Sequence, residues 1–253
     1  MCNWSPVHEE LDYWSTVGKT ASFWWRDDDV IEDTPQLGRL LRLSDATGTP
    51  LTLAVIPTYA VNELAEQTED RGHISIAVHG YSHQNYAPKT EKKRELGLHR
   101  ESQIVLSELS QGFTKLEAMF PNGFIKALVP PWNRIDHQLV EQLPRLGFSS
   151  LSTFQPRQSK YAAPGLPQVN CHIDPIEWHG TRSLVPSDVL VEQTRSLLER
   201  QRLGLIDAEE PLGLLTHHLV HDDAIWDFTE SFVKLVQNHP ASQFVIGLER
   251  PSD

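Results

Sequence analysis

The sequence predicts an α/β fold, a closed or nearly closed (β/α) barrel with roughly seven or eight mostly parallel strands. Short apolar, β-branched segments alternate along the chain with longer segments of helical periodicity. This alternation is typical of a parallel sheet with helices outside it, and 253 residues hold about that many β/α units. A doubly wound open sheet is the alternative, which the pattern leaves open.

The elements follow from this pattern. The predicted strands are residues 21–25, 51–56, 74–78, 127–129, 149–154, 169–173, 212–216 and 244–248. The predicted helices are residues 34–46, 60–69, 89–118, 137–146, 187–202 and 224–238. Two helix starts have recognisable caps. Asp33-Thr34-Pro35 offers a cap followed by a proline in the first turn, and Pro186-Ser187-Asp188 does the same with an acidic residue near the positive end of the helix dipole.

The chain shows no internal repeat and no Gly/Ser-rich linker. We therefore expect a single domain over residues 21–253, preceded by an N-terminal arm, residues 1–20, in which no signal is recognisable. The two cysteines, Cys2 and Cys171, offer no disulfide framework. Nothing in the sequence sets the oligomeric state.

Charge and hydropathy restrict the partners. With 22 basic and 34 acidic residues, the formal net charge is −12. Such a surface repels nucleic acid and anionic lipid, so we expect neither as a partner, and a neutral or cationic small ligand fits better. No run of about eighteen apolar residues predicts a membrane span. The first residues lack a basic segment followed by an apolar one, so we expect a cytoplasmic protein.

Polar clusters follow several predicted strands. "RDDD" follows the first strand, "HGYSH" the third, "PPWNR" the fourth, and "THH" ends the strand at 212–216. In β/α architectures the carboxyl ends of the strands converge on one face, where active sites form. We therefore expect these clusters to lie close together.

The "HGYSH" segment predicts a metal site. His79 and His83 are four residues apart, which allows both imidazoles to reach one ion. Zn²⁺ and similar divalent ions accept imidazole nitrogen, and a carboxylate can complete a set of three ligands. One of the three aspartates at 27–29 is the natural third ligand, because a bound cation removes most of the repulsion between neighbouring carboxylates. Taken alone, a histidine pair at this spacing is more often structural.

The "THH" segment offers a proton donor. Consecutive strand residues face opposite sides, so only one of its two histidines can point into the site. His217 shares the face of Leu215 and is the candidate, and its ordinary pKa suits general acid catalysis. His218 and His221 are expected to be structural or exposed.

Taken in order, the motifs DD, HxxxH, PPW, DxxEW and LxH resemble those of the polysaccharide deacetylase family (the NodB homology domain, carbohydrate esterase family 4). The resemblance runs from Asp27 to His217. It implies a distorted (β/α) barrel that removes acetyl groups from N-acetylated sugars with one divalent metal ion. Zn²⁺ is the first expectation, with Co²⁺, Mn²⁺ or Ni²⁺ as alternatives, and the expected substrate is a small molecule or an oligosaccharide.

The resemblance also implies roles for residues. Asp27 is expected to be the catalytic base, and His217 the general acid, oriented by Asp174 of "DPIEW". Asp28 is expected to join His79 and His83 as the third metal ligand. The residues expected to contact the sugar are Trp25, Tyr81, Pro131, Trp132, Asn133 and Trp178, although Trp25 fits a position in the barrel core equally well.

Two departures leave alternatives open. Val129 occupies the position of the family's motif-three arginine, and Asp29 occupies that of a glycine. The first suggests a catalytically silent, carbohydrate-binding relative. A metal-independent hydrolase of cyclic amides on the same fold is the other alternative, and the retention of all three expected ligands argues against it.

Overall fold

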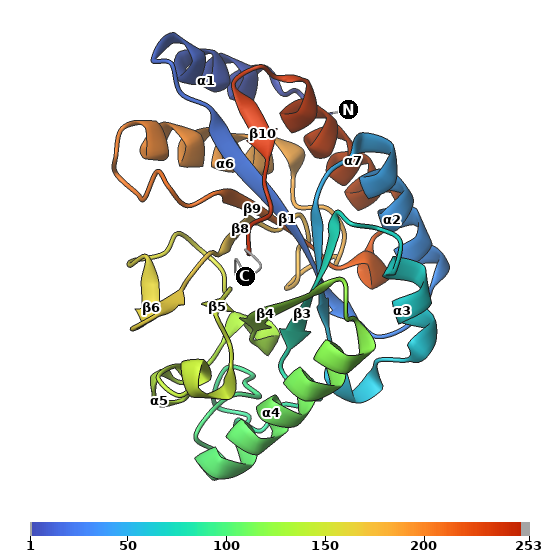
Figure 1. The fold of residues 1–253 in the computed structure, drawn as a ribbon. Coiled ribbons are helices and arrows are strands. Elements are labelled where there is room, and N and C mark those ends of the chain that lie inside the picture. The colour runs from blue at the N-terminus through green and yellow to red at the C-terminus, as the bar shows by residue number, and fades with distance from the viewer. Residues whose placement is uncertain (1, 249–253) are drawn as a thin grey trace. The chain divides into compact units, whose positions relative to one another are not determined.

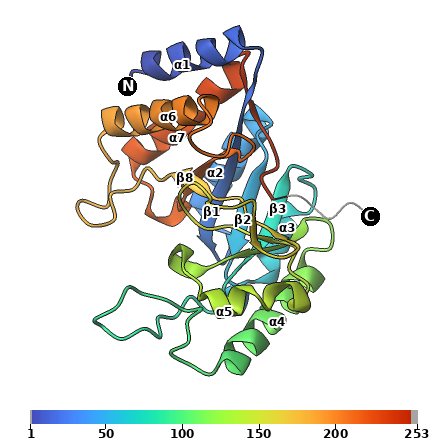
Figure 2. The same cartoon turned by 90° about the vertical axis from the view of Figure 1, so that its left-hand side faces the viewer.

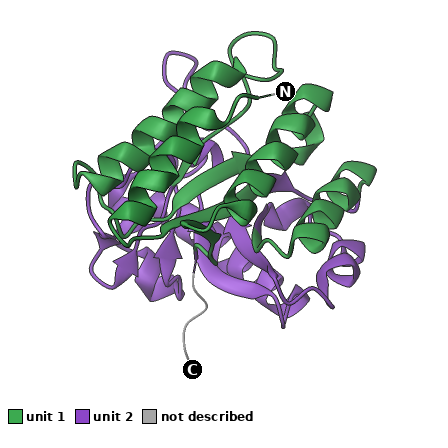
Figure 3. Ribbon diagram, turned by 90° about the horizontal axis from the view of Figure 1, so that it is seen from above, with its two compact units in different colours: residues 1–27, 34–51, 171–247 green, residues 28–33, 52–170, 248–253 purple. Residues whose placement is uncertain are grey.

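A computed structural model describes residues 2–248. The chain forms two compact units, coloured separately in Figure 3. Unit 1 is made of the described parts of residues 1–27, 34–51 and 171–247, and unit 2 of the described parts of residues 28–33, 52–170 and 248–253. The boundary passes through the first strand, between Asp27 and Asp28. The single-domain assignment of residues 21–253 stays a prediction.

The strands of the main sheet follow the order β5-β4-β3-β2-β1-β9-β8, with β10 paired to β1 off this path. The pairs of β1 with β9, β9 with β8, β3 with β4 and β4 with β5 are all parallel. From β1 to β5 the order is sequential, without the reversal that a doubly wound sheet shows in its middle. The predicted class is confirmed: α/β, with the mostly parallel strands of a distorted (β/α) barrel.

Unit 1 combines segments from the beginning of the chain with the segment from residue 171 to residue 247, whose elements Figure 1 labels. Its elements are α1 (Ser5–Thr16), most of β1 (Ala21–Val30), α2 (Pro35–Thr47), β8 (Cys171–Ile173), α6 (Ser187–Arg202), β9 (Leu212–Thr216), η4 (His218–Val220), α7 (Asp223–Asn238) and β10 (Ser242–Phe244). The register of β1 and β9 runs from Phe23↔Leu212 to Asp27↔Thr216. Helix α1 packs on α6, as Figures 1 and 2 both show.

Unit 2 contains the middle of the chain. Its elements are most of β2 (Leu51–Val55), η1 (Pro57–Tyr59), α3 (Asn62–Thr68), β3 (Ile74–His79), α4 (Ser102–Met119), β4 (Phe124–Val129), η2 (Pro131–Asn133), α5 (His137–Val140), η3 (Leu143–Leu146), β5 (Ser150–Leu151), β6 (Tyr161–Ala163) and β7 (Leu166–Pro167). Strands β2 and β3 are buried along their whole length, as expected of strands in a parallel sheet covered on both faces.

Local chemistry explains the helix starts. The Thr34 side chain accepts a hydrogen bond from the Leu37 N–H at 3.0 Å, so it caps α2 as predicted. Helix α6 has the predicted bounds, with Asp188 in its first turn. At α7 the cap is Asp222, whose side chain accepts from the Ile225 N–H at 2.9 Å. None of the helices in the described residues has the length and hydropathy needed to cross a membrane.

One helix was not predicted, and one predicted helix begins later than expected. The N-terminal arm contains α1, whose buried residues Val7, Leu11 and Trp14 recur at helical spacing. The helix predicted from residue 89 begins at Ser102. Before it, the Asn85 side chain accepts from the backbone N–H of Arg94 at 2.9 Å, which holds the segment in a non-helical loop.

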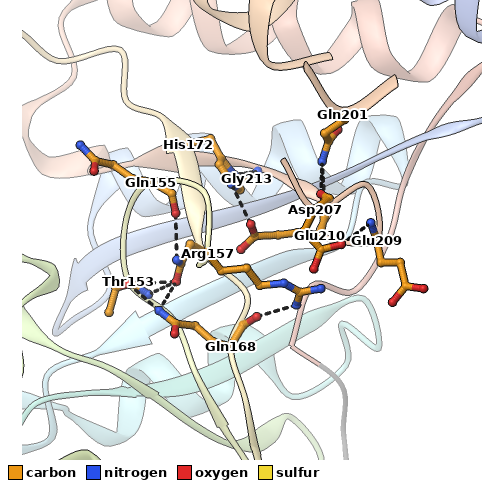
Figure 4. A network of polar contacts seen from close by, with 11 residues as sticks. Thr153, Gln155, Arg157, Gln168, His172, Gln201, Asp207, Glu209, Glu210 and Gly213 are labelled. Atoms are coloured by element: carbon orange, nitrogen blue, oxygen red, sulfur yellow. Dashed lines mark hydrogen bonds and ion pairs between the residues drawn. The ribbon is translucent and has the colours of Figure 1, made fainter. Parts of the chain in front are cut away.

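A buried polar pair fixes the start of β9. His172 Nδ1 accepts from the Gly213 N–H at 3.0 Å, so its Nε2 carries the proton and donates to Glu210 at 3.3 Å. Both side chains are almost fully buried, and Figure 4 shows them meeting at the sheet. Because a buried carboxylate needs donors, this pair ties β8 to β9 within unit 1.

Candidate active site

Three side chains of unit 2, Asp29, His79 and His83, each offer one ligand atom, and these atoms all lie within 4.8 Å of one another. Asp29 Oδ1 is 3.1 Å from His79 Nε2 and 3.2 Å from His83 Nε2. Atoms bound at about 2.1 Å to one ion lie about 3.4 Å apart in a tetrahedron and about 3.0 Å apart in an octahedron. The spacing therefore fits a divalent ion with one carboxylate and two imidazole ligands.

The main chain of β4 fixes the tautomer of His79. This residue ends β3, is 1% exposed, and places Nδ1 2.9 Å from the Val129 carbonyl oxygen. Because a carbonyl only accepts, Nδ1 carries a proton, which leaves Nε2 facing Asp29: it donates to this carboxylate when protonated and can bind an ion when it is not. The Gly80 N–H donates to the same carbonyl at 3.2 Å. Val129 thus contributes through its backbone, whatever its side chain.

Charges around the histidines favour a cation. Burial by itself would lower the pKa of His79, but the charge of Asp28 and the hydrogen bond to Asp29 outweigh it and raise that pKa. Burial and the neighbouring His79 lower the pKa of His83, against the charges of Asp29 and Glu95. The negative charges of these carboxylates therefore surround the two imidazoles, an arrangement that a divalent ion would complete.

The structure brings Asp29, rather than Asp28, together with the two histidines. Asp29 has a φ of 66°, a conformation rare outside glycine, so its carboxylate leaves the side-to-side alternation of a regular strand. Asp28 is 2% exposed, and its charge acts on His79. The positive φ agrees with the alignment of position 29 with a glycine, which adopts such angles freely. The ligand role of Asp28 stays a prediction.

The "PPWN" segment lies beside His83. The Trp132 ring is 4.4 Å from the His83 ring, centroid to centroid, and Trp132 and Asn133 have φ angles of 54° and 57° that form a tight turn. Pro131 is buried against Gly80, so it supports the turn. The Tyr81 hydroxyl is 3.5 Å from Gln111 of α4. Of the aromatic residues expected to contact the sugar, Trp132 therefore lies against His83 of the Asp29–His79–His83 cluster.

In unit 1, Asp27 is fully buried and engages both of its oxygens. Its Oδ1 lies 2.5 Å from His218 Nδ1, while Oδ2 accepts from the Thr216 hydroxyl at 2.7 Å and from the His218 N–H at 3.0 Å. Burial would raise the pKa of Asp27, but the charge of His218 and the hydrogen bonds from His218 and Thr216 lower it. Asp27 is thus an ionised carboxylate with a histidine partner.

His217 and the "DPIEW" segment also meet in unit 1. The Trp178 and His217 rings are 4.7 Å apart in an edge-to-face arrangement, and the Trp178 indole N–H donates to Asp174 Oδ2 at 2.8 Å. Asp174 therefore binds Trp178, whose ring contacts His217, and its role in orienting His217 stays a prediction. Glu177 instead binds the Thr181 hydroxyl at 2.8 Å in its own loop.

Trp25 lies in the core, which corrects the expectation that it contacts the sugar. Its side chain is 1% exposed, and its indole N–H donates to the Thr216 hydroxyl at 2.9 Å. A ring buried to this extent has no face to offer a sugar. Its position in β1, beside β9, explains the burial.

Three polar residues near the predicted ones were not assigned a role from the sequence. His218, set aside as structural, pairs with Asp27 because the carboxylate lies beside the end of β9 in the parallel register. His221 accepts from the His217 N–H at 3.3 Å, and burial lowers its pKa to about 4. Glu95 is fully buried beneath the "HGYSH" segment. Glu95 lies within the helix predicted over residues 89–118, and nothing in that pattern indicated a buried acidic residue.

The sequence matches no protein-family model and no curated protein. Solved structures do match. The family 4 carbohydrate esterase from Streptomyces lividans in complex with acetate has 18% identity and a TM-score of 0.55, covering 92% of this chain and 98% of its own. The catalytic domain of a peptidoglycan N-acetylglucosamine deacetylase from Eubacterium rectale has 13% identity and a TM-score of 0.57, covering 89% and 88%.

A family 4 acetyl xylan esterase from Clostridium thermocellum, in complex with a cobalt ion, has 11% identity and a TM-score of 0.52, covering 88% of this chain and 87% of its own. This chain has the fold of the family 4 carbohydrate esterases. The resemblance carried by the sequence motifs is confirmed at the level of the fold, and the low identities fit a divergent member.

Proposed function

We propose that the chain is a metal-dependent hydrolase that removes an acetyl group from an N-acetylated sugar or a related small amide. The observation that carries the proposal is the Asp29–His79–His83 cluster, whose spacing fits one divalent ion. The shared fold supports it, because the similar proteins include a peptidoglycan N-acetylglucosamine deacetylase and an esterase solved with cobalt. Zn²⁺ is the expected ion, and Co²⁺, Mn²⁺ and Ni²⁺ are alternatives.

A divalent ion held by these three side chains would polarise the amide carbonyl and acidify a bound water. The protein's part is to present the ligands. His79 keeps its Nε2 lone pair available because Nδ1 donates to the Val129 carbonyl. Asp29 supplies the anionic ligand at the end of β1.

We assign proton transfer to Asp27 and its partner His218. Asp27 precedes Asp29 by two residues in the sequence. The 2.5 Å contact between Asp27 Oδ1 and His218 Nδ1 orients the imidazole and stabilises its protonated form. The pair would accept a proton from the attacking water.

The leaving nitrogen needs a proton in return, and His217 is the proposed donor. Its ring is held edge-to-face on Trp178, which is anchored on Asp174. Water adds to the acetyl carbon, the C–N bond breaks, and acetate and a free amine are released. The face of Trp132 beside His83 is suited to a sugar ring, so the proposed partner is a small sugar or an oligosaccharide.

The test combines metal content with turnover. The purified protein is analysed for bound metals, stripped, and reloaded separately with Zn²⁺, Co²⁺, Mn²⁺ or Ni²⁺, and acetate release is measured on a panel of N-acetyl sugars, small amides and acetyl esters. We expect release that depends on the ion. A fully loaded protein that releases acetate from none of these compounds would refute the proposal.

Two variants separate binding from chemistry. His79→Ala should lose the ion, because it removes an imidazole that faces Asp29. Asp27→Asn should keep the ion and lose turnover, because it removes the charge that holds His218. Turnover by stripped His79→Ala protein would favour the metal-independent alternative.

A further inference from the structure

The turn between the two metal-binding histidines rests on a buried acid. Glu95 is fully buried in the loop that precedes α4. Its Oε1 accepts from the Ser82 N–H at 2.7 Å and from the Ser82 hydroxyl at 3.0 Å, and its Oε2 accepts from the Tyr81 N–H at 3.2 Å. Successive backbone N–H groups that converge on an anion are a recurrent way to hold a carboxylate.

The turn is shaped around this carboxylate. Gly80 has a φ of 58°, and a Cβ at this position would come within 2.1 Å of Glu95 Oε2 and 2.6 Å of the Pro131 ring. A side chain is therefore excluded both by conformation and by space. His83, which closes the turn, also has a positive φ, of 54°. Two such angles in four residues need partners that hold the backbone in place.

Other contacts of the turn are made by uncharged groups. The Tyr81 carbonyl accepts from the Thr58 N–H at 3.0 Å and from the Thr58 hydroxyl at 2.7 Å, and the Gly80 N–H donates to Val129. These contacts fix the first half of the turn. Glu95 binds the N–H of Ser82, the residue directly before His83, so it controls where the second imidazole lies.

We propose that Glu95 is a positioning residue that holds His83 at the separation from His79 that a divalent ion requires. The inference rests on the proposed metal centre and adds a residue to it that none of the sequence motifs contains. The carboxylate also brings a further negative charge close to the cluster, besides Asp28 and Asp29, and so favours a cation over an empty site.

Glu95→Gln tests the proposal, because it keeps the size of the side chain and changes its hydrogen bonding. A carboxylate accepts with both oxygens, whereas glutamine would turn its NH₂ group toward one of the N–H donors. We expect the affinity for Zn²⁺ or Co²⁺ to fall about 10- to 100-fold, the range for residues that orient a metal ligand. Glu91→Gln is the matched control, because it makes the same change at an exposed position of the same loop, and it should bind as the wild type does.

Three measurements on metal-free and reloaded protein decide the matter: Zn²⁺ affinity by chelator competition, the rise in melting temperature on adding Zn²⁺, and amide hydrogen exchange without metal. We expect Glu95→Gln to show a smaller rise, and faster exchange at Tyr81 and Ser82 than in the wild type or Glu91→Gln. A merely structural role would lower both melting temperatures and leave the rise unchanged. Wild-type affinity in folded Glu95→Gln would overturn the proposal.

Failure of the proposed function looks different. A wild type that binds Zn²⁺ but releases no acetate refutes the hydrolase and leaves the affinity test of Glu95 intact. If the wild type takes up no ion, the proposed metal centre is refuted, and the positioning role of Glu95 is refuted with it, whatever the exchange data show. Should Glu95→Gln not fold, Ser82→Ala removes one of the three donors, and unchanged Zn²⁺ affinity there would overturn the proposal.

Discussion

Replacing Asp29 by asparagine should remove the divalent ion from the cluster, whereas the same change at Asp28 should only weaken its binding. Asp29 Oδ1 lies 3.1 and 3.2 Å from the two imidazole nitrogens. An ion about 2.1 Å from each nitrogen would therefore touch this oxygen directly. Asp28 acts on His79 through its charge, as the raised pKa of His79 indicates.

The expected magnitudes separate the two variants. Loss of a residue that only supports a ligand lowers metal affinity about 10- to 100-fold. Loss of a direct ligand must exceed this, so we expect Asp29→Asn to weaken binding by more than about 100-fold, or at least about 2.8 kcal/mol. For Asp28→Asn we expect a loss within the 10- to 100-fold range.

The assay is a competition between protein and a chromogenic chelator for Zn²⁺, repeated with Co²⁺, whose absorption spectrum reports the ligand set. Melting temperatures of the stripped proteins check that both variants fold. If Asp28→Asn lost the ion and Asp29→Asn retained it, the ligand inferred from the geometry would be wrong, and the role that the sequence motif implied for Asp28 would be right.

Three further predictions concern stability in unit 1. Asp222→Ala should lower the free energy of unfolding by about 1 kcal/mol through loss of the α7 cap. The hydrogen bonds that Asp222 accepts from Ser183 and Ile225 lower its pKa, so the loss should be present at neutral pH and vanish as the pH falls through that pKa. Urea titrations at pH 7 and pH 3 would show the difference. Burial lowers the pKa of His221 to about 4, so the unfolded chain binds its proton first, and stability should fall as the pH drops from about 6.5 toward 4. His221→Gln should flatten this part of the profile, and an unchanged slope would contradict the reasoning. Arg202→Gln should lower the free energy of unfolding by about 2–3 kcal/mol, because it breaks a two-point contact with the buried Glu10 at 2.6 and 3.0 Å. Thermal or urea unfolding measures the change, and a change near zero would mean that the contact is not kept in solution.

Most of the sheet could be predicted because its signals are local. Strand β9 and helix α6 have the bounds that apolar runs and caps indicated. The region before α4 could not be predicted in this way. Residues 89–101 contain good helix formers, yet the Asn85 side chain binds the backbone N–H of Arg94, and the Glu95 side chain binds that of Ser82. Contacts between residues distant in sequence overrode the local preference.

The site shows the same division. The histidine pair could be recognised from its spacing, and the aspartates from their place after a strand. Which aspartate joins the histidines depends on the φ of Asp29, which no pattern of residue types encodes. The partner of Asp27 depends on the register of β1 against β9, which is a tertiary property. The motifs therefore indicated the chemistry of the site, whereas the three-dimensional structure was needed to identify the atoms that face one another.

The hydrogen bond that sets the imidazole of His79 ends on a peptide oxygen of residue 129, an atom that all twenty amino acids possess. A guanidinium at this position can be exchanged for an isopropyl group without altering the acceptor that the ring sees. The side chains that position 129 accepts are limited by their volume, since the Val129 side chain is enclosed by protein. The position can therefore lose an ionic side chain while the adjacent histidine keeps its orientation.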